Sequence, residues 1–248
     1  MTVLTIDNGN STTKAAIWED NILKESYVME MPDVEELSRI IETLKPEACI
    51  LSSVGKMDSR ALETLRMFFD GRLVVLTASV PLPLKIKYDS KATLGSDRIA
   101  AAAGALSLYS HEGVLVADCG TAITLDVINS TGHFLGGNIS PGLSLRFKSL
   151  HDSTSCLPLV NEVGPLPTFG TDTLSAIRSG VVEGVLSEIE GAYMRASSAY
   201  GVTRMVITGG DAPFLTPLLR QNGLDPVQCP QLVQQGLLYI LDYNIRRK

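Results

Sequence analysis

Cysteine and histidine are scarce in this chain, and neither occurs in a pattern that binds zinc or forms disulfides. Among 248 residues there are four cysteines and three histidines. No two cysteines have CxxC spacing and no histidines form an HExxH motif, so we expect neither a structural zinc site nor a disulfide framework. Such cysteine usage is typical of a reducing compartment, which predicts a cytoplasmic protein.

Long hydrophobic runs and an excess of positive charge are also lacking. No run of about 18 apolar residues is present, and the N-terminus shows no signal-peptide pattern, so we expect no membrane span. With 21 Lys and Arg against 27 Asp and Glu, the net charge is −6, which argues against nucleic acid as the main partner. The 45% of hydrophobic residues is ordinary for a globular protein that buries a core.

An internal repeat is the most informative feature of the chain's organisation. In two places, a strand ends in the Asp of an Asp-x-Gly sequence, which is followed by hydroxyl residues in a turn. Two further strands then complete a three-stranded meander. The strands are expected at residues 2–7, 14–18 and 22–29 in the first copy, and at 113–118, 122–128 and from 133 in the second. The repeat predicts two similar α/β halves, residues 1–112 and 113–248, with a cleft between them as the place for chemistry.

Helices and further strands alternate after each meander. Apolar residues at helical spacing predict the helices, and short β-rich runs predict the strands. The helices are expected at residues 34–44, 59–69, 97–109, 173–200 and 231–244, and the strands at 48–52, 73–76 and 204–208. We expect Ser59 to cap one helix and either Thr171 or Asp172 to cap another. Because the helix at 97–109 is rich in small residues, it should pack closely against a neighbour.

The segment 7–14, DNGNSTTK, has the residues that a phosphate-binding turn needs, although it lacks the GxxxxGK[ST] spacing of a P-loop. Gly9 allows a tight turn whose amides can face an anion, and residues 11–13 add hydroxyl donors. Lys14 supplies positive charge, and Asp7 is a suitable ligand for hydrated Mg²⁺. The alternative is a hairpin turn with polar tips and no ligand.

A second turn, Asp118-Cys119-Gly120-Thr121, repeats this arrangement. Two acid–glycine–hydroxyl turns on duplicated strands could face each other and bind two sides of a polyphosphate–metal complex. The alternative is that duplication copied the turn without a function. Both copies kept the acid and a hydroxyl, which favours the binding hypothesis.

Two helices carry further candidate residues. Gly95-Ser96-Asp97-Arg98 opens a helix, where Asp97 could complement the helix dipole or orient a substrate hydroxyl, and Tyr88 could line the same site. The long helix at 173–200 contains Gly180, Gly184 and Gly191. Glycine is unfavourable inside a helix, so these residues predict close approach of another backbone, from this chain or a second subunit.

Taken in order, these motifs resemble the type III pantothenate kinases of bacteria, members of the actin-like superfamily. The resemblance covers nearly the whole chain. It rests on Asp7-x-Gly9-Asn10, Leu94-Gly95-x-Asp97-Arg98, Asp118-x-Gly120-Thr121-Ala122-x-Thr124-x-Asp126, Gly136-Gly137-x-Ile139-x-Pro141-Gly142, Thr173 before a helix with Gly180, and Thr208-Gly209-Gly210. Two positions depart from the family's pattern: Ser11 stands where threonine is usual, and Lys91 where many members have proline.

The resemblance implies two RNase H-like halves, each a mixed five-stranded sheet with flanking helices, in a homodimeric enzyme. That enzyme would phosphorylate pantothenate with ATP, the first step of coenzyme A biosynthesis. By the same likeness, ATP with Mg²⁺ would contact Asp7, Asn8, Gly9, Asn10, Ser11, Thr12, Thr13, Lys14 and Thr121. Pantothenate would contact Tyr88, Gly95, Ser96, Asp97, Arg98 and Thr173. Asp97 would be the general base, and Asp118 would hold a monovalent cation, K⁺ or NH₄⁺.

Two alternatives to this function stay open from the sequence. One is another small-molecule kinase of the same superfamily, which substrate screening would separate. The other is a non-catalytic nucleotide-binding regulator with the same fold, which the presence of Asp97 disfavours.

Overall fold

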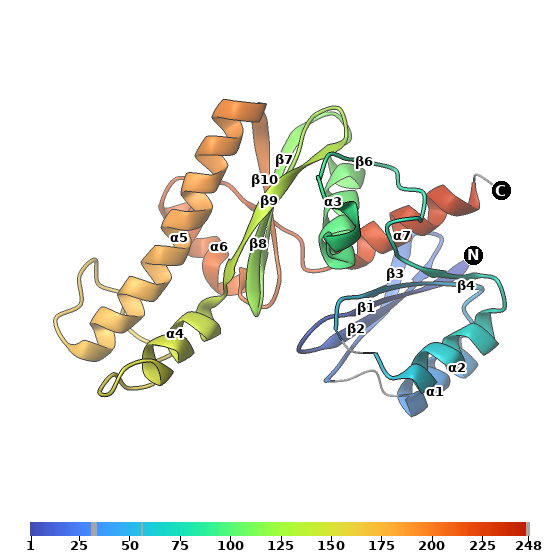
Figure 1. Cartoon of the computed structure of the whole chain (residues 1–248), viewed down its shortest axis with the longest axis horizontal. Helices are drawn as coiled ribbons and strands as arrows, with labels where there is room; N and C mark the ends of the chain where they lie inside the picture. Colours follow the sequence, from blue (N-terminus) through green and yellow to red (C-terminus); the bar gives the residue numbers. More distant parts are fainter. Residues whose placement is uncertain (31–33, 56, 247–248) are drawn as a thin grey trace. The chain divides into compact units, whose positions relative to one another are not determined.

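The computed structural model describes residues 1–30, 34–55 and 57–246 (Figure 1). These residues form two compact units. Unit 1 comprises the described residues of Met1–Ser110, Gly132–Phe134 and Gln231–Lys248, and unit 2 comprises His111–Thr131 and Leu135–Pro230. The duplicated halves predicted from the sequence repeat, residues 1–112 and 113–248, have different bounds from these units and stay a prediction.

Unit 1 is built on a five-stranded mixed sheet. Its strands are β1 (Thr2–Asn8), β2 (Thr13–Glu19), β3 (Ile22–Met29), β4 (Ala48–Ser53) and β5 (Leu73–Val75). Their order is β3-β2-β1-β4-β5, in which the first three form the antiparallel meander and β4 and β5 run parallel to β1. This order places the C-terminal ends of β1 and β4 side by side.

Helices cover both faces of the unit 1 sheet (Figure 1). On one face, α1 (Val34–Leu44) and α2 (Ser59–Phe69) bury their apolar residues against the strands. Asp58, and not Ser59, is the N-cap of α2, because the Asp58 side chain accepts a hydrogen bond from the backbone of Arg60.

On the other face, α3 (Ser96–Leu108) lies beside α7 (Leu232–Ile245) (Figure 1). Glycines make this close packing possible: a Cβ on Gly236 would lie 2.7 Å from the carbonyl carbon of Ala100, and one on Gly104 would lie 3.2 Å from that of Leu232. The small-residue helix therefore packs closely against a neighbour, as its composition predicts.

Unit 2 repeats the same strand order. Its strands are β7 (Gly113–Cys119), β8 (Ala122–Ile128), β9 (His133–Pro141), β10 (Val202–Thr208) and β11 (Val227–Gln228). Their order, β9-β8-β7-β10-β11, corresponds strand by strand to β3-β2-β1-β4-β5 of unit 1. The first two residues of β9, which belong to unit 1, pair in parallel with the short strand β6 (Lys85–Ile86). The repeated order confirms the predicted duplicated α/β fold.

Three helices complete unit 2, and a short helical turn, η1 (Lys91–Thr93), precedes α3 in unit 1. The long helix α5 (Thr173–Tyr200) packs on the sheet together with α6 (Ala212–Gln221), and α4 (Leu143–Asp152) lies beside the first part of α5 (Figure 1). Asp172 is the N-cap of α5, in a capping box with Ser175. None of the helices in the described part of the chain combines the length and hydropathy that a membrane span needs.

Candidate functional site

The turn between β1 and β2 is held rigidly by its own residues. The N–H of Gly9 donates to the carbonyl of Thr12 across 3.0 Å, which closes the turn. Asn8 is only 2% exposed. Its side-chain Nδ2 donates to the Ser53 hydroxyl at 2.9 Å, and its side-chain Oδ1 accepts from the Thr13 hydroxyl at 2.9 Å. Asn8 and Thr13 therefore support the turn from inside, while its tip stays accessible.

The loop that follows β4 lies directly against this turn. The backbone N–H groups of Val54 and Gly55 both donate to the backbone carbonyl of Asn8, at 3.1 and 3.2 Å. A Cβ on Gly55 would overlap the carbonyl oxygen of Gly9 and lie 3.1 Å from its carbonyl carbon. Only glycine allows this approach, so Gly55 is a site residue that the sequence interpretation missed. Its one signal was a glycine shortly after a predicted strand.

The polar residues of the 7–14 segment lie at the same end of the sheet. Asp7 stands opposite Lys14 on β2 and opposite Ser52 on β4, so a carboxylate, an ammonium and a hydroxyl share one row of the sheet. Asn10 and Ser11 are exposed at the tip, and Asp7 and Lys14 are half-buried. The amides and hydroxyls of the tip are donors of the kind that bind an anion.

The N-terminus of α3 reaches this row of residues. Ser96 is 8% exposed, and its hydroxyl is 3.0 Å from the hydroxyl of Ser52, which is fully buried. Asp97 follows on the helix, half-buried, with a carboxylate that accepts the N–H of Arg98 at 2.8 Å. The structure thus brings together two of the predicted segments, 7–14 and 95–98, within unit 1.

Arg98 lies against two aromatic rings. It is 5% exposed, and its guanidinium carbon is 5.7 Å from the ring centres of both Tyr88 and Phe134. The two rings meet edge to face at 6.1 Å. These cation–π contacts restrain the guanidinium, whose fork can bind a carboxylate directionally. Phe134 is a second residue that sequence reasoning missed, because an aromatic residue on a strand is ordinarily part of the core.

The second turn, between β7 and β8, contains Gly120 and is contacted by Gly142, which follows β9. Gly120 donates its N–H to the carbonyl of Ala122 at 3.1 Å, and Gly142 donates to the carbonyl of Thr121 at 3.0 Å. A Cβ on Gly142 would lie 2.9 Å from the same Thr121 oxygen. Thr121 is exposed, so its hydroxyl can contact a ligand.

Asp118 lies close against Gly209, where a side chain would not fit. Gly209 has a φ of +92°, and a Cβ there would lie 2.7 Å from the Asp118 carboxylate. Nearby, Asp211 donates its N–H to the Cys119 carbonyl at 2.9 Å. The Asp211 carboxyl accepts the N–H of Leu143, yet burial raises its pKa above the ordinary value. The described residues contain no cluster of three or more His, Cys, Asp or Glu that could hold a metal by themselves.

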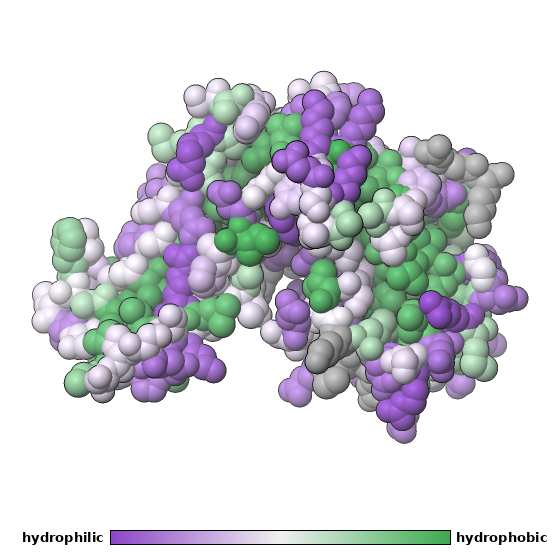
Figure 2. All heavy atoms as spheres, viewed as in Figure 1, coloured by the Kyte–Doolittle hydropathy of each residue, from purple (hydrophilic) through white to green (hydrophobic). Residues whose placement is uncertain are grey.

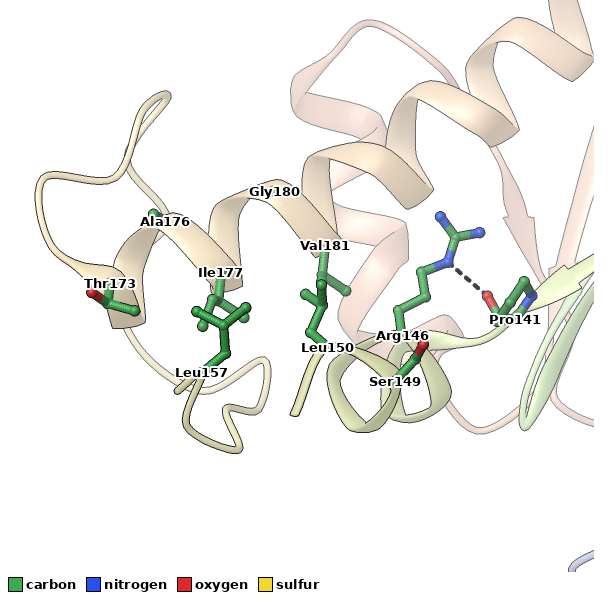
Figure 3. Close-up of a pocket in the computed structure, with 10 residues that line it drawn as sticks. All are labelled: Pro141, Arg146, Ser149, Leu150, Leu157, Thr173, Ala176, Ile177, Gly180 and Val181. Atoms are coloured by element: carbon green, nitrogen blue, oxygen red, sulfur yellow. Dashed lines mark hydrogen bonds between the residues drawn. The ribbon is translucent and has the colours of Figure 1, made fainter. Parts of the chain in front are cut away.

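Thr173 lies elsewhere in unit 2, at the edge of a cavity of about 670 Å³ between α4 and α5 (Figure 3). The cavity is mostly apolar, with Arg146 near its other end, where the Arg146 side chain donates to the Pro141 carbonyl at 2.7 Å. Its lining residues are Pro141, Arg146, Ser149, Leu150, Leu157, Thr173, Ala176, Ile177, Gly180 and Val181. Thr173 and Pro141 stand at opposite ends of this cavity. Gly142, the residue after Pro141, donates its N–H to the Thr121 carbonyl of the β7–β8 turn.

The fold first defines a broad class of proteins. Over 98% of this chain and 99% of the other, it resembles a Baf-family protein of Campylobacter jejuni, with a TM-score of 0.65 and 24% identity. It also resembles a glucokinase from an Antarctic psychrotroph, with a TM-score of 0.58, 12% identity and the same coverage. The fold is therefore the actin-like one, built from duplicated RNase H-like halves.

Sequence comparison defines the family within this class. The family model described as type III pantothenate kinase matches residues 3–195. A type III pantothenate kinase of Porphyromonas gingivalis is 38% identical over 98% of both chains. One from Christiangramia forsetii is 36% identical over 97% of this chain and 98% of its own. This chain belongs to the type III pantothenate kinase family.

Proposed function

We propose that this chain transfers the γ-phosphoryl group of ATP to pantothenate and forms 4′-phosphopantothenate, the first step of coenzyme A biosynthesis. The observation that carries the proposal is the position of Asp97 beside the 7–14 turn in unit 1, in a chain of this family. An acid next to a phosphate-binding turn is the arrangement that a kinase acting on an alcohol needs.

The 7–14 turn binds the phosphates of ATP. Phosphoryl transfer depends mainly on positioning and on neutralising charge, and a turn that is held by Asn8 and Gly55 needs little reorganisation when the nucleotide binds. The tip amides and Ser11 donate to phosphate oxygens, and Lys14 adds positive charge. Mg²⁺, which arrives with ATP, neutralises the phosphates, and a lone carboxylate such as Asp7 suits it because Mg²⁺ keeps most of its ligands as water and phosphate oxygens.

Asp97 acts on the hydroxyl that attacks. Its carboxylate orients the primary alcohol of pantothenate and accepts the proton as the bond to phosphorus forms. A carboxylate is a weak base for an alcohol, so the proton moves late in the reaction and orientation is the larger contribution. Because the helix start is anchored through Ser96, the carboxylate has a defined position.

Arg98 and Tyr88 bind the other end of the substrate. The guanidinium fork matches a carboxylate in a bidentate geometry, and the two neighbouring rings restrain it. The low exposure of Arg98 strengthens such a contact, because little water competes for it.

Asp118 and Thr121 contribute from the second turn. The carboxylate of Asp118 is a charged oxygen donor, and Gly209 allows the backbone to lie close against it. We propose K⁺ or NH₄⁺ at Asp118. The exposed hydroxyl of Thr121 contacts ATP.

The α4–α5 region supports a homodimer in which Thr173 contacts pantothenate. Figure 2 shows hydrophobic residues gathered over this region, and the exposed ones include Phe169, which is 85% exposed. A Cβ on Gly180 would meet no atom within 4 Å, and one on Gly184 would meet only Arg146 at 3.8 Å. Within the described part of the chain, no backbone outside α5 lies against these two glycines, so a second subunit is the better explanation of the glycine pattern.

One coupled assay tests the proposed function and its cation. ADP release is followed with ATP, pantothenate and one of K⁺, NH₄⁺, Na⁺ or a bulky organic cation at fixed ionic strength. We expect pantothenate-dependent turnover that rises with K⁺ or NH₄⁺. Turnover with a different alcohol alone would identify another kinase of the superfamily. ATP binding without turnover would identify a nucleotide-binding regulator.

Light scattering tests the assembly. We expect a dimer at micromolar concentration, and a fully active monomer would contradict the proposed homodimer. The cytoplasmic location and the absence of a nucleic-acid partner remain predictions from the sequence.

A further inference from the structure

Two buried serines link the strand end that carries the phosphate-binding turn to the helix that carries Asp97. Ser52 lies on β4 directly opposite Asp7, and it is fully buried. Ser96 is the first residue of α3 and is 8% exposed. Their hydroxyl oxygens are 3.0 Å apart, so one hydroxyl donates to the other.

The start of α3 receives no hydrogen bond from a capping side chain. Its N-cap is Gly95, which offers no side chain to cap the helix. The Asp97 carboxylate, which could have capped it, instead accepts the N–H of the next residue, Arg98. Further along, α3 packs closely on α7, where Gly236 lies against Ala100.

We propose that Ser52 and Ser96 are positioning residues: their hydrogen bond holds the Asp97 end of α3 against the end of β1 and β4 that carries the phosphate-binding turn. This inference rests on the proposed function. The chemistry requires the attacking hydroxyl, held at Asp97, and the γ-phosphate, held at the turn, to approach in line. A misplacement of about 1 Å can lower a rate by about 10²-fold, so a contact that couples the two segments controls turnover.

Kinetics of serine variants test the inference. In Ser52→Ala and Ser96→Ala, we expect kcat to fall about 10- to 100-fold, with a nearly unchanged KM for ATP because the turn itself keeps its supports. The double variant should lose no more than either single variant, because the two hydroxyls act as one pair. Ser96→Thr keeps a hydroxyl at the same place and should retain most of kcat.

Ser107→Ala is the matched control. Ser107 lies on the same helix, and its hydroxyl donates only to the Gly104 carbonyl, at 2.7 Å. Its removal should leave kcat at the wild-type value. If Ser52→Ala and Ser96→Ala fold and match Ser107→Ala in kcat, the serine pair is only part of the core and the inference is wrong.

A second readout needs no substrate. Hydrogen–deuterium exchange of the free protein reports local opening of the first turn of α3. We expect faster exchange at residues 97–100 in Ser52→Ala than in Ser107→Ala, and unchanged exchange there would overturn the inference. If the wild-type chain does not phosphorylate pantothenate, the proposed function fails, while the exchange data still decide whether the serine pair positions the helix.

Discussion

Replacing Gly55 by alanine would displace the phosphate-binding turn, because Gly55 lies directly against the backbone of Gly9. The new Cβ would overlap the Gly9 carbonyl oxygen and lie 3.1 Å from the carbonyl carbon and 3.6 Å from the Asn10 Cα. All three atoms belong to backbone, so none can rotate away. Overpacking of this kind costs about 1–3 kcal/mol. For a domain of this size, that lowers Tm by roughly 2–12 °C.

The effect on catalysis should exceed the effect on stability. Relief of the overlap requires the turn to move, and a shift of about 1 Å lowers kcat/KM for ATP by about 10²-fold. The assay is steady-state kinetics with ATP varied at saturating pantothenate, together with thermal unfolding.

Gly71→Ala is the control for lost stability alone. Gly71 has a φ of +78° and no atom near its Cβ position, so alanine there is strained but clashes with nothing. It lies just before β5, whose Leu73 pairs with Cys49 at the opposite end of β4 from Ser53. We expect a lower Tm with unchanged kcat/KM. If Gly55→Ala keeps wild-type kcat/KM for ATP, or if both variants lose activity in step with Tm, the turn does not bind the nucleotide as described.

Three further predictions concern single side chains. Asp97→Asn keeps the size of the side chain but not its charge, and kcat should fall about 10²–10⁴-fold; near wild-type turnover of the folded variant would leave Asp97 with a structural role only. Arg98→Lys keeps the charge and loses the bidentate fork, so KM for pantothenate should rise while KM for ATP stays nearly constant; the reverse pattern would contradict the assignment. The pKa of Asp172 is lowered by hydrogen bonds from the backbone and hydroxyl of Ser175, so its stabilising effect is present above the pKa of an unfolded Asp and is lost as pH falls through the folded-state pKa. The gap in Tm between wild type and Asp172→Ala should therefore narrow on acidification, and a gap that is constant with pH would argue against the charged cap.

Much of the fold could be predicted because its elements have clear local patterns. The helices at 34–44, 59–69 and 173–200 begin and end where apolar spacing placed them, and both meanders are present. The two-residue strands β6 and β11 carry no periodicity, since pairing with distant strands defines them. The helix α4 has an irregular apolar pattern, because it buries Leu143 and Phe147 on unit 2 while its other residues face the cavity or solvent.

The candidate site divides in a similar way. Residues that would touch a ligand, such as Asp7 and Asp97, lie in turns and helix starts with recognisable motifs. The residues that support them, Ser52, Gly55 and Phe134, are distant in sequence and resemble ordinary strand and loop residues. Their roles depend on strand register and on packing between segments, which a local pattern does not contain.

The central claim is that the Asp97 carboxylate, anchored beside the 7–14 turn, directs the phosphoryl group of ATP to the primary hydroxyl of pantothenate. Its most direct test is single-turnover reaction of wild type and Asp97→Asn with ATP and pantothenate, with the product identified by mass spectrometry. We predict 4′-phosphopantothenate in an amount equal to the ADP formed by wild type, and almost none from the variant. ADP without phosphopantothenate from wild type, or equal product from both proteins, would contradict the claim.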